Sequence, residues 1–276
     1  MDIIYLLKGI IIAIVEGITE FLPISSTGHL IITNYLLDFG NGGFEKMFMV
    51  VIQLGAILAI IVLYWDKLFG LVKSLFRGEA RGRHFTIALL IGVLPAAILG
   101  FTLDDFIESK LFSVPTVILA LVIGAGLMIW FEKMYRGKAK IQNVEDITPL
   151  MALKIGLFQC LALWPGMSRS ATTIMGGWNQ GLAPELAAEF SFFLAIPIMF
   201  GASGLKLAKY GINGGFATIT GTQIATLLVG FAVAFIVALL CVRAFMSYIK
   251  KKPMKVFAYY RFILAAALVI FMLINR

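Results

Sequence analysis

The sequence predicts an all-α polytopic membrane protein with six transmembrane helices, two re-entrant helical hairpins and an inverted-topology repeat. The 276 residues are 61% hydrophobic and only 14% charged, with a mean hydropathy of +0.97. Soluble domains are nearer half apolar and a quarter charged. Six apolar runs approach the length of about 20 residues that a helix needs to cross the hydrocarbon. Two further apolar stretches are each broken by a polar turn.

The six predicted spans are ordinary apolar runs, and two of them contain a proline. Pro95 and Pro197 lie inside spans, where neighbouring helices can satisfy the carbonyl that proline leaves free. Each therefore predicts a kink. The spans cover residues 47–65, 84–103, 114–131, 187–205, 223–247 and 256–274.

The loops between the spans carry a charge pattern that predicts the orientation. Six spans put three basic loops on one side, which is the cytoplasm under the positive-inside rule, and put an acidic loop outside. The net charge of +8 is therefore interpreted as membrane topology, and nucleic acid is excluded as a partner. The basic residues are Lys67, Lys73, Arg77, Arg81 and Arg83 in the first loop, Lys133, Arg136, Lys138 and Lys140 in the second, and Lys250, Lys251, Lys252 and Lys255 in the third; the acidic loop contains Asp104, Asp105 and Glu108.

The two broken stretches do not fit as spans. Residues 3–37 contain a first polar turn at 23–29, after which only Leu30 to Leu37 remain apolar. Eight helical residues cover about 12 Å, far less than the hydrocarbon thickness. Residues 149–182 behave alike, with a second polar turn at 165–170. We predict that each stretch enters the membrane and leaves on the same side.

The two halves of the chain share an order of features: a helix, a proline-led polar turn, a short helix, a glutamate and three spans. An offset of 144 residues pairs Ser26 with Ser170. Because each half has three spans, the first hairpin opens outward and the second inward, which is an inverted-topology repeat. The predicted units are a single membrane domain over 1–276, repeats at 1–131 and 149–276, and a cytoplasmic linker at 132–148.

Glu16 and Glu20 are spaced i, i+4 inside the first apolar stretch, so their side chains share one helix face. An ionisable group at the bilayer centre costs roughly 2.5–3.5 kcal/mol on insertion scales. Two of them therefore point to a function: binding of a divalent metal ion, pairing with Arg169, or holding a proton for transfer. A shallow, water-exposed position, where they only cap the hairpin, is the structural alternative.

The first turn is rich in hydroxyl groups. Hydroxyls and free backbone N–H groups at a helix start bind anions, so Ser25 and Thr27 are candidate phosphate ligands. A short helix would bring Ser26 and His29 to one side, which suits a serine nucleophile with a neighbouring acid or base. An ordinary N-cap beside a core histidine is the alternative, but the two glutamates nearby favour catalysis.

The second turn carries Arg169, the one arginine in a broken segment at midplane depth. A guanidinium flanked by hydroxyls recognises phosphate through bidentate hydrogen bonds. A structural salt bridge to Glu16 or Glu20 is the alternative, and such a pair could persist until substrate arrives. The flanking hydroxyls interpreted as phosphate ligands belong to Ser168, Ser170 and Thr173.

Both turns resemble the signatures of the bacterial undecaprenyl-diphosphate phosphatase family, also called the bacitracin-resistance protein family. The resemblance is carried by residues 16–29 (EGITEFLPISSTGH) and 165–170 (PGMSRS), with further similarity at 158–164 and 189–197. It covers essentially the whole chain. One departure is Ala171, where the family usually has glycine. Because a methyl group excludes most positive-φ conformations, this departure predicts an altered local backbone more than an altered chemistry.

The resemblance implies hydrolysis of undecaprenyl diphosphate to undecaprenyl phosphate, which recycles the lipid carrier of cell-wall synthesis and gives bacitracin resistance. It implies a divalent cation, Mg²⁺ or Ca²⁺, for which Glu16 and Glu20 are the candidate ligands. It also implies an active site on the outer, periplasmic side of the bacterial plasma membrane. The expected partners are a prenyl-diphosphate lipid and the membrane, and a homodimer is left open. The family's functional residues carry over to Glu16, Glu20, Ser26, His29, Ser168, Arg169 and Thr173.

The resulting hypothesis places the diphosphate between the two hairpins, where Arg169 and the turn hydroxyls hold it. Ser26 attacks the terminal phosphorus and His29 transfers a proton; attack by water, activated by His29 or a glutamate, is the competing mechanism. A proton-coupled secondary transporter or lipid flippase is the main rival, because such proteins share inverted repeats and broken helices. Lipid phosphatases related to soluble acid phosphatases need a second catalytic histidine, for which His84 is badly placed.

Overall fold

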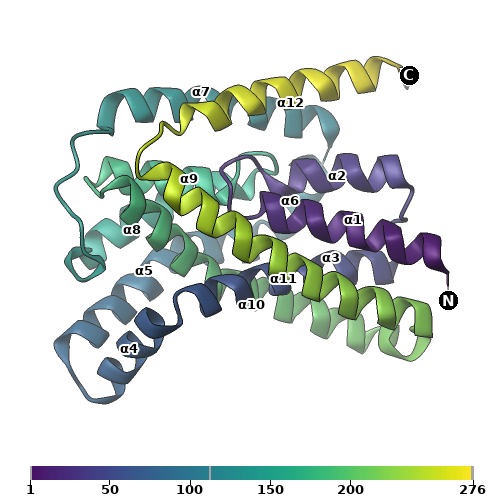
Figure 1. Ribbon diagram of the computed structural model, residues 1–276, viewed down its shortest axis with the longest axis horizontal. Coiled ribbons are helices and arrows are strands. Elements are labelled where there is room, and N and C mark those ends of the chain that lie inside the picture. Colours follow the sequence, from purple (N-terminus) through teal and green to yellow (C-terminus); the bar gives the residue numbers. More distant parts are fainter. Residues whose placement is uncertain (1, 112, 275–276) are drawn as a thin grey trace.

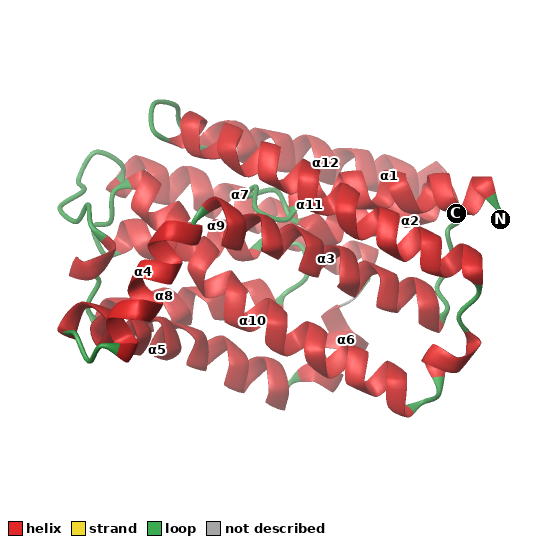
Figure 2. Cartoon of the chain, turned by 60° about the horizontal axis from the view of Figure 1, so that its bottom comes forward, coloured by secondary structure: helices red, strands yellow, loops and turns green. Residues whose placement is uncertain are grey.

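The computed structural model describes residues 2–111 and 113–274, apart from the side chains of Asp104 and Glu108, so those two predicted acidic-loop side chains lie outside the description. The regular elements of the described residues are helices, gathered into one bundle (Figures 1 and 2). Six of them are long and apolar enough to cross a membrane, and each overlaps one predicted span. They are α3 (Gly43–Leu63), α5 (Ala80–Thr102), α7 (Val114–Tyr135), α10 (Pro184–Ile212), α11 (Gly221–Ile249) and α12 (Lys255–Ile274).

The two broken stretches form helix–turn–helix units. In the first, α1 (Ile3–Thr19) is followed by the first turn and α2 (Ser26–Leu37). In the second, α8 (Pro149–Gln159) continues through the 3₁₀ turn η2 (Cys160–Leu163) to the second turn and α9 (Arg169–Asn179). Within each unit the two helices pack against each other. The prediction of a helix, a turn and a short helix in each stretch is therefore confirmed.

Helix α4 (Trp65–Phe76) lies where the sequence predicted the first basic loop. Its exposed apolar side chains, Trp65, Phe69, Val72 and Phe76, recur at helical spacing, which is the pattern of an amphipathic helix. The sequence analysis assigned this segment to a loop because of its basic residues and did not consider the spacing of its apolar residues. The predicted loop is therefore wrong at this point. The shorter elements α6 (Asp104–Leu111), η1 (Val144–Asp146) and η3 (Gly215–Thr218) complete the chain.

Each broken stretch packs against a span from the opposite half of the chain. Helix α1 lies along α11, and α8 lies along α5 (Figure 1). Glycines allow this close approach: a Cβ added at Gly17 would lie 2.8 Å from the carbonyl oxygen of Ala234, and one added at Gly156 would lie 2.2 Å from that of Gly92. The two polar turns are thus held by helices from both halves.

The three basic segments adjoin one another at one end of the bundle. Arg81 pairs with Glu145 at 2.5 Å, which joins the first segment to the second. Arg136 donates to the carbonyl oxygen of Ile249 at 3.4 Å, which joins the second segment to the third. This arrangement agrees with the prediction that six spans bring the basic segments to the same side.

Candidate active site

Each polar turn ends in a serine that caps the next helix. Ser25 and Ser168 both have a φ of 71°, and the side chain of each accepts the backbone N–H three residues on, at 3.4 Å. A positive φ is uncommon for a residue other than glycine and is found disproportionately at functional sites. The caps place Ser26 and Arg169 at the first positions of α2 and α9.

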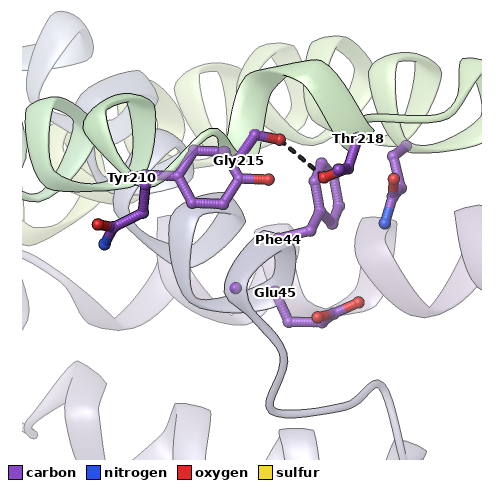
Figure 3. Close-up of a pocket in the computed structure, with 8 residues that line it drawn as sticks. Phe44, Glu45, Tyr210, Gly215 and Thr218 are labelled. Carbon is purple, nitrogen blue, oxygen red and sulfur yellow. Dashed lines mark hydrogen bonds between the residues drawn. The ribbon is translucent and has the colours of Figure 1, made fainter.

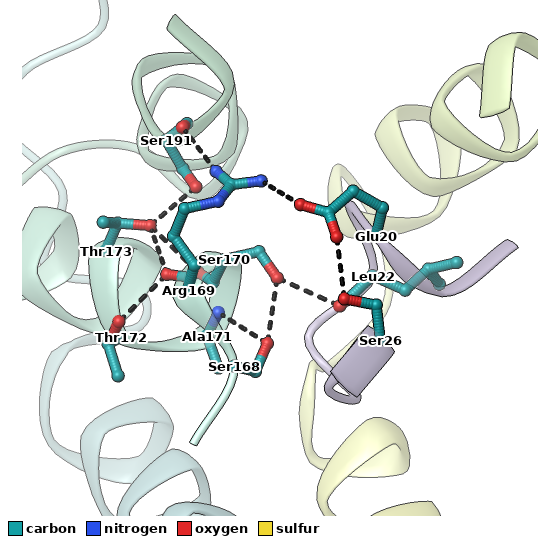
Figure 4. Close-up of polar contacts among 10 residues, drawn as sticks. All are labelled: Glu20, Leu22, Ser26, Ser168, Arg169, Ser170, Ala171, Thr172, Thr173 and Ser191. Atoms are coloured by element: carbon teal, nitrogen blue, oxygen red, sulfur yellow. Dashed lines mark hydrogen bonds and ion pairs between the residues drawn. The ribbon is translucent and has the colours of Figure 1, made fainter. Parts of the chain in front are cut away.

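The two turns meet at the Arg169 guanidinium (Figure 4). Its Nη2 donates to Oε1 of Glu20 at 3.1 Å, and the second carboxylate oxygen of Glu20 accepts the Ser26 hydroxyl at 2.7 Å. The Arg169 and Glu20 side chains are only 14% and 9% exposed, so this is not a solvent-screened surface pair. The salt bridge considered for Arg169 is therefore present, and its carboxylate also accepts the hydrogen bond from Ser26.

A second contact joins the turns through their hydroxyl groups (Figure 4). Ser170 donates to the carbonyl oxygen of Leu22 at 3.0 Å, and the Ser168 and Ser170 oxygens lie 3.1 Å apart. Because the single Ser170 proton goes to a carbonyl, the Ser168 hydroxyl is the donor between the two serines. Ser170, predicted as a phosphate ligand, is fully buried and ties the second turn to the first.

Ser191 of α10 is a part of this cluster that the sequence analysis missed. Its backbone carbonyl accepts Nη1 of Arg169 at 3.1 Å, and its hydroxyl accepts that of Thr173 at 2.6 Å. Thr173, a predicted phosphate ligand, therefore lies behind the guanidinium and supports it. The available signals were a serine within a largely apolar span and the family resemblance at 189–197.

His29 faces α12. Its Nδ1 lies 2.7 Å from the carbonyl oxygen of Ser25, and its Nε2 lies 2.7 Å from the Tyr260 hydroxyl. A carbonyl only accepts, so Nδ1 carries the proton and Nε2 of the neutral ring accepts from Tyr260. The rings of His29 and Tyr260 stack, with their centroids 5.6 Å apart. Both ring nitrogens are thus occupied away from Ser26, whose partner is Glu20.

Glu16 and Thr27 make none of these hydrogen bonds, although Glu16 lies close enough to Glu20 and Arg169 to interact with their charges. Glu16 is fully buried on α1, and neither of its carboxylate oxygens has a hydrogen-bond partner among the described residues. Thr27 is half-buried on α2. Within residues 2–111 and 113–274, no group of three or more His, Cys, Asp or Glu side chains could hold a metal ion. The assignment of Glu16 and Glu20 as metal ligands stays a prediction.

A cavity of about 450 Å³ lies away from the polar turns. It is lined by the start of α3, the end of α10 and the segment before α11, including Phe44, Glu45, Tyr210 and Thr218 (Figure 3). None of the predicted site residues is among those that line it. This cavity is therefore not the candidate active site.

The sequence model of the family described as bacitracin resistance protein BacA matches residues 9–267 of this chain. The chain belongs to the BacA family. An undecaprenyl-diphosphatase of Clostridium tetani is 52% identical over 96% of both chains. Undecaprenyl-diphosphatase 2 of Clostridioides difficile is 47% identical over all of this chain and 98% of its own. An undecaprenyl-diphosphatase of Clostridium perfringens is 45% identical over 95% of this chain and 94% of its own. The chain is accordingly a multi-pass membrane protein of a bacterial family.

Ala171, which departs from the second BacA motif, does not take a positive φ. Ala171 is helical within α9 and fully buried. The positive-φ residues of this turn are Gly166, at 102°, and Ser168. A helical φ accommodates a methyl group, so this backbone does not require glycine at position 171.

Proposed function

We infer that this chain is an undecaprenyl-diphosphatase, which hydrolyses undecaprenyl diphosphate to undecaprenyl phosphate and inorganic phosphate. The observation that carries this function is the run of contacts from Arg169 through Glu20 to Ser26, which joins the two BacA motifs. A cation that recognises phosphate, a carboxylate and a hydroxyl nucleophile are the groups that phosphoryl transfer to a side chain needs. The long, nearly full-length relatives that bear this name support the same reaction. Consumption of undecaprenyl diphosphate also accounts for bacitracin resistance.

Arg169 is the proposed ligand of the diphosphate. Its Nη2 is held by a carboxylate oxygen of Glu20, and its Nη1 by the Ser191 carbonyl. Phosphate presents the same paired oxygen acceptors as a carboxylate, so it can replace Glu20 on the guanidinium. The Ser25, Thr27 and Ser168 hydroxyls border the same turns and complete the proposed phosphate ligands.

Ser26 is the proposed nucleophile. Its oxygen attacks the terminal phosphorus, its proton passes to the Glu20 carboxylate 2.7 Å away, and the bridging P–O bond breaks to release undecaprenyl phosphate. Water then cleaves the phosphoserine, which restores the hydroxyl, and the proton held by Glu20 is released to solvent. The hydrogen bond favours Glu20 over His29 as the group that takes this proton. Direct attack by water remains the competing mechanism.

His29 is the second proposed proton-transfer group. Its Nε2 contacts the Tyr260 hydroxyl, which fixes the orientation of the ring. We propose that His29 takes a proton from solvent at Nε2 and gives it to the departing phosphate oxygen, which leaves the ring neutral again, because Ser26 already has a carboxylate partner.

We propose that a divalent cation binds beside Glu16. Its two buried carboxylate oxygens lack partners among the described residues, and Glu20 lies one helical turn away. Carboxylate oxygens are the ligands that Mg²⁺ and Ca²⁺ take in proteins. When bound, such an ion supplies positive charge that neutralises the diphosphate. Glu16 and Glu20 are its proposed ligands.

We propose that the units α1–α2 and α8–α9 are re-entrant hairpins of an inverted repeat over 1–131 and 149–276, joined at 132–148. The hairpins lie at opposite ends of the bundle (Figure 1), and each packs on a span of the other half. Ser25 and Ser168, which cap the second helix of each unit, have the same φ, and this supports the correspondence between the units. The two serines are separated by one residue fewer than the predicted offset of 144. With the basic segments in the cytoplasm, the first hairpin opens to the outside, which is the proposed side of the active site.

The test of this function is phosphate release by the purified full-length protein in detergent. With undecaprenyl diphosphate and Mg²⁺ or Ca²⁺ we expect stoichiometric undecaprenyl phosphate and inorganic phosphate. Excess EDTA is expected to abolish release, and added divalent cation to restore it.

Glu16→Gln should lower activity at least about 100-fold, because a proposed metal ligand is lost, whereas the exposed control Glu79→Gln should retain it. Movement of the lipid across vesicles without phosphate release would establish a transporter instead.

A further inference from the structure

Arg261 of α12 is a charged side chain buried outside the proposed catalytic cluster. Its exposed fraction is 0%. Its Nη1 donates to the carbonyl oxygen of Met167 at 3.0 Å, and its Nη2 donates to those of Gly166 at 2.8 Å and Ala120 at 3.1 Å. These bonds satisfy Nη1 and Nη2, as a buried guanidinium needs, whereas the buried Nε has no hydrogen-bond partner among the described residues. Two of the three carbonyls belong to the second turn, directly before Ser168.

Gly124 of α7 leaves the space that the Arg261 guanidinium fills. A Cβ added there would lie 2.2 Å from Nη2 of Arg261 and 2.8 Å from its Cζ. A Cβ added at Gly126, two residues further along the same helix, would meet nothing within 4 Å. The position of the Arg261 guanidinium therefore requires glycine at residue 124, whereas residue 126 could carry a side chain without a clash.

The residue before Arg261 contacts the first turn. Tyr260 donates to Nε2 of His29 at 2.7 Å, and the two rings stack with an interplanar angle of 3°. Two consecutive residues of α12 thus reach both polar turns. Among the described residues, neither side chain makes a hydrogen bond to Ser26, Glu20 or Arg169, so their effect on those groups is exerted through the turns.

Helix α12 is itself fixed at its start by Glu132 of α7. The Glu132 carboxylate accepts the backbone N–H groups of Met254 and Lys255, each at 2.6 Å, and pairs with Arg136 at 2.6 Å. An anion at a helix N-terminus satisfies donors that lack helical partners. This anchor sets the axial position of Tyr260 and Arg261 relative to α7.

We propose that Tyr260 and Arg261 are positioning residues that hold the two turns in register for catalysis. Arg261 binds the second turn through its carbonyls and so aims Arg169 at Glu20, while Tyr260 fixes the ring orientation of His29. Because Arg261 is fully buried, it acts on the turn and does not bind phosphate. This inference rests on the proposed phosphatase activity.

The experiment measures kcat and KM for phosphate release from undecaprenyl diphosphate, together with the melting midpoint in detergent, for matched variants of the full chain. Arg261→Met removes the donors, Arg261→Lys keeps a charge with fewer, and Gly124→Ala displaces the guanidinium. Tyr260→Phe removes one hydroxyl. The controls are Gly126→Ala, Tyr259→Phe, and Arg243→Met at an exposed arginine of α11.

We expect Arg261→Met and Gly124→Ala each to lower kcat/KM by about 100-fold, the size expected when a catalytic group is misplaced by about 1 Å. Arg261→Lys should fall between these variants and the wild type. The double variant should be no worse than Arg261→Met alone, because both changes break the same contacts. Tyr260→Phe should lower kcat about tenfold with KM and melting midpoint unchanged. The controls should stay within about twofold of the wild type.

The outcomes separate this inference from the function on which it rests. If the wild type itself releases no phosphate, the proposed function fails. If the wild type is active and folded Gly124→Ala and Tyr260→Phe match their controls, the positioning role fails. The positioning role would also fail if Arg261→Met and Gly124→Ala lowered kcat/KM additively in the double variant. It would likewise fail if each loss of activity matched the loss of folded protein.

Discussion

Arg169→Ala is expected to lower kcat/KM for undecaprenyl diphosphate by at least about 10³-fold. The guanidinium is mostly buried and held in place by Ser191 and Glu20, so it is a preorganised donor where phosphate charge must be stabilised. Removal of one such donor costs roughly 10²–10³ in rate, and this side chain offers two donors. Arg169→Lys should recover only a small part, because an ammonium cannot reproduce the planar bidentate contact. Phosphate release under single-turnover conditions measures the effect.

Loss of Arg169 also leaves the Glu20 carboxylate unpaired, which would destabilise the fold. The double variant Arg169→Ala/Glu20→Gln removes that charge and should restore the melting midpoint without restoring activity. Arg243→Ala, on an exposed part of α11, is the matched control and should behave as the wild type. An active Arg169→Ala protein would remove the arginine from the mechanism.

Ser26→Ala is expected to lower kcat by at least about 10³-fold, because loss of a serine nucleophile removes the covalent step. With terminally ³²P-labelled substrate, an acid quench of the wild type should trap a phosphoserine in the peptide that contains Ser26. Ser247→Ala, which changes an exposed serine of α11, should leave the rate unchanged. Retention of more than about a tenth of the wild-type kcat, with no labelled peptide, would favour direct attack by water.

The spans and turns could be predicted because hydropathy and helix-breaking residues act locally. Each predicted span overlaps one of the six long helices, and both polar turns lie where Pro23 and Pro165 interrupt apolar sequence. Helix α4 was missed because its basic residues dominated the interpretation and its apolar face, with Trp65 and Phe69 exposed, points outward. A charge count carries no information on helical spacing.

The partners within the site could not be predicted, because they depend on contacts between distant segments. Arg169 and Glu20 are 149 residues apart, and His29 and Tyr260 are 231 apart. Sequence spacing suggested that Ser26 and His29 face each other, whereas tertiary packing turns one toward Glu20 and the other toward α12. Ser191 lies in the segment 189–197 that resembles the family, and Arg261 is a charge inside a predicted span. Neither pattern says that these side chains contact the turns.

The central claim is that the two turns, far apart in the chain, meet at Glu20 and Arg169. The most direct test replaces these two residues with cysteine in a background in which Cys160 and Cys241 are alanine. A protease site is inserted beside the exposed Gly137, and membranes are treated with a bifunctional methanethiosulfonate reagent as long as the ion pair. After cleavage, the account predicts that the two halves stay linked in the Glu20→Cys/Arg169→Cys protein. They should separate in each single variant and in Glu20→Cys/Lys251→Cys. Halves that separate equally in all four proteins would contradict it.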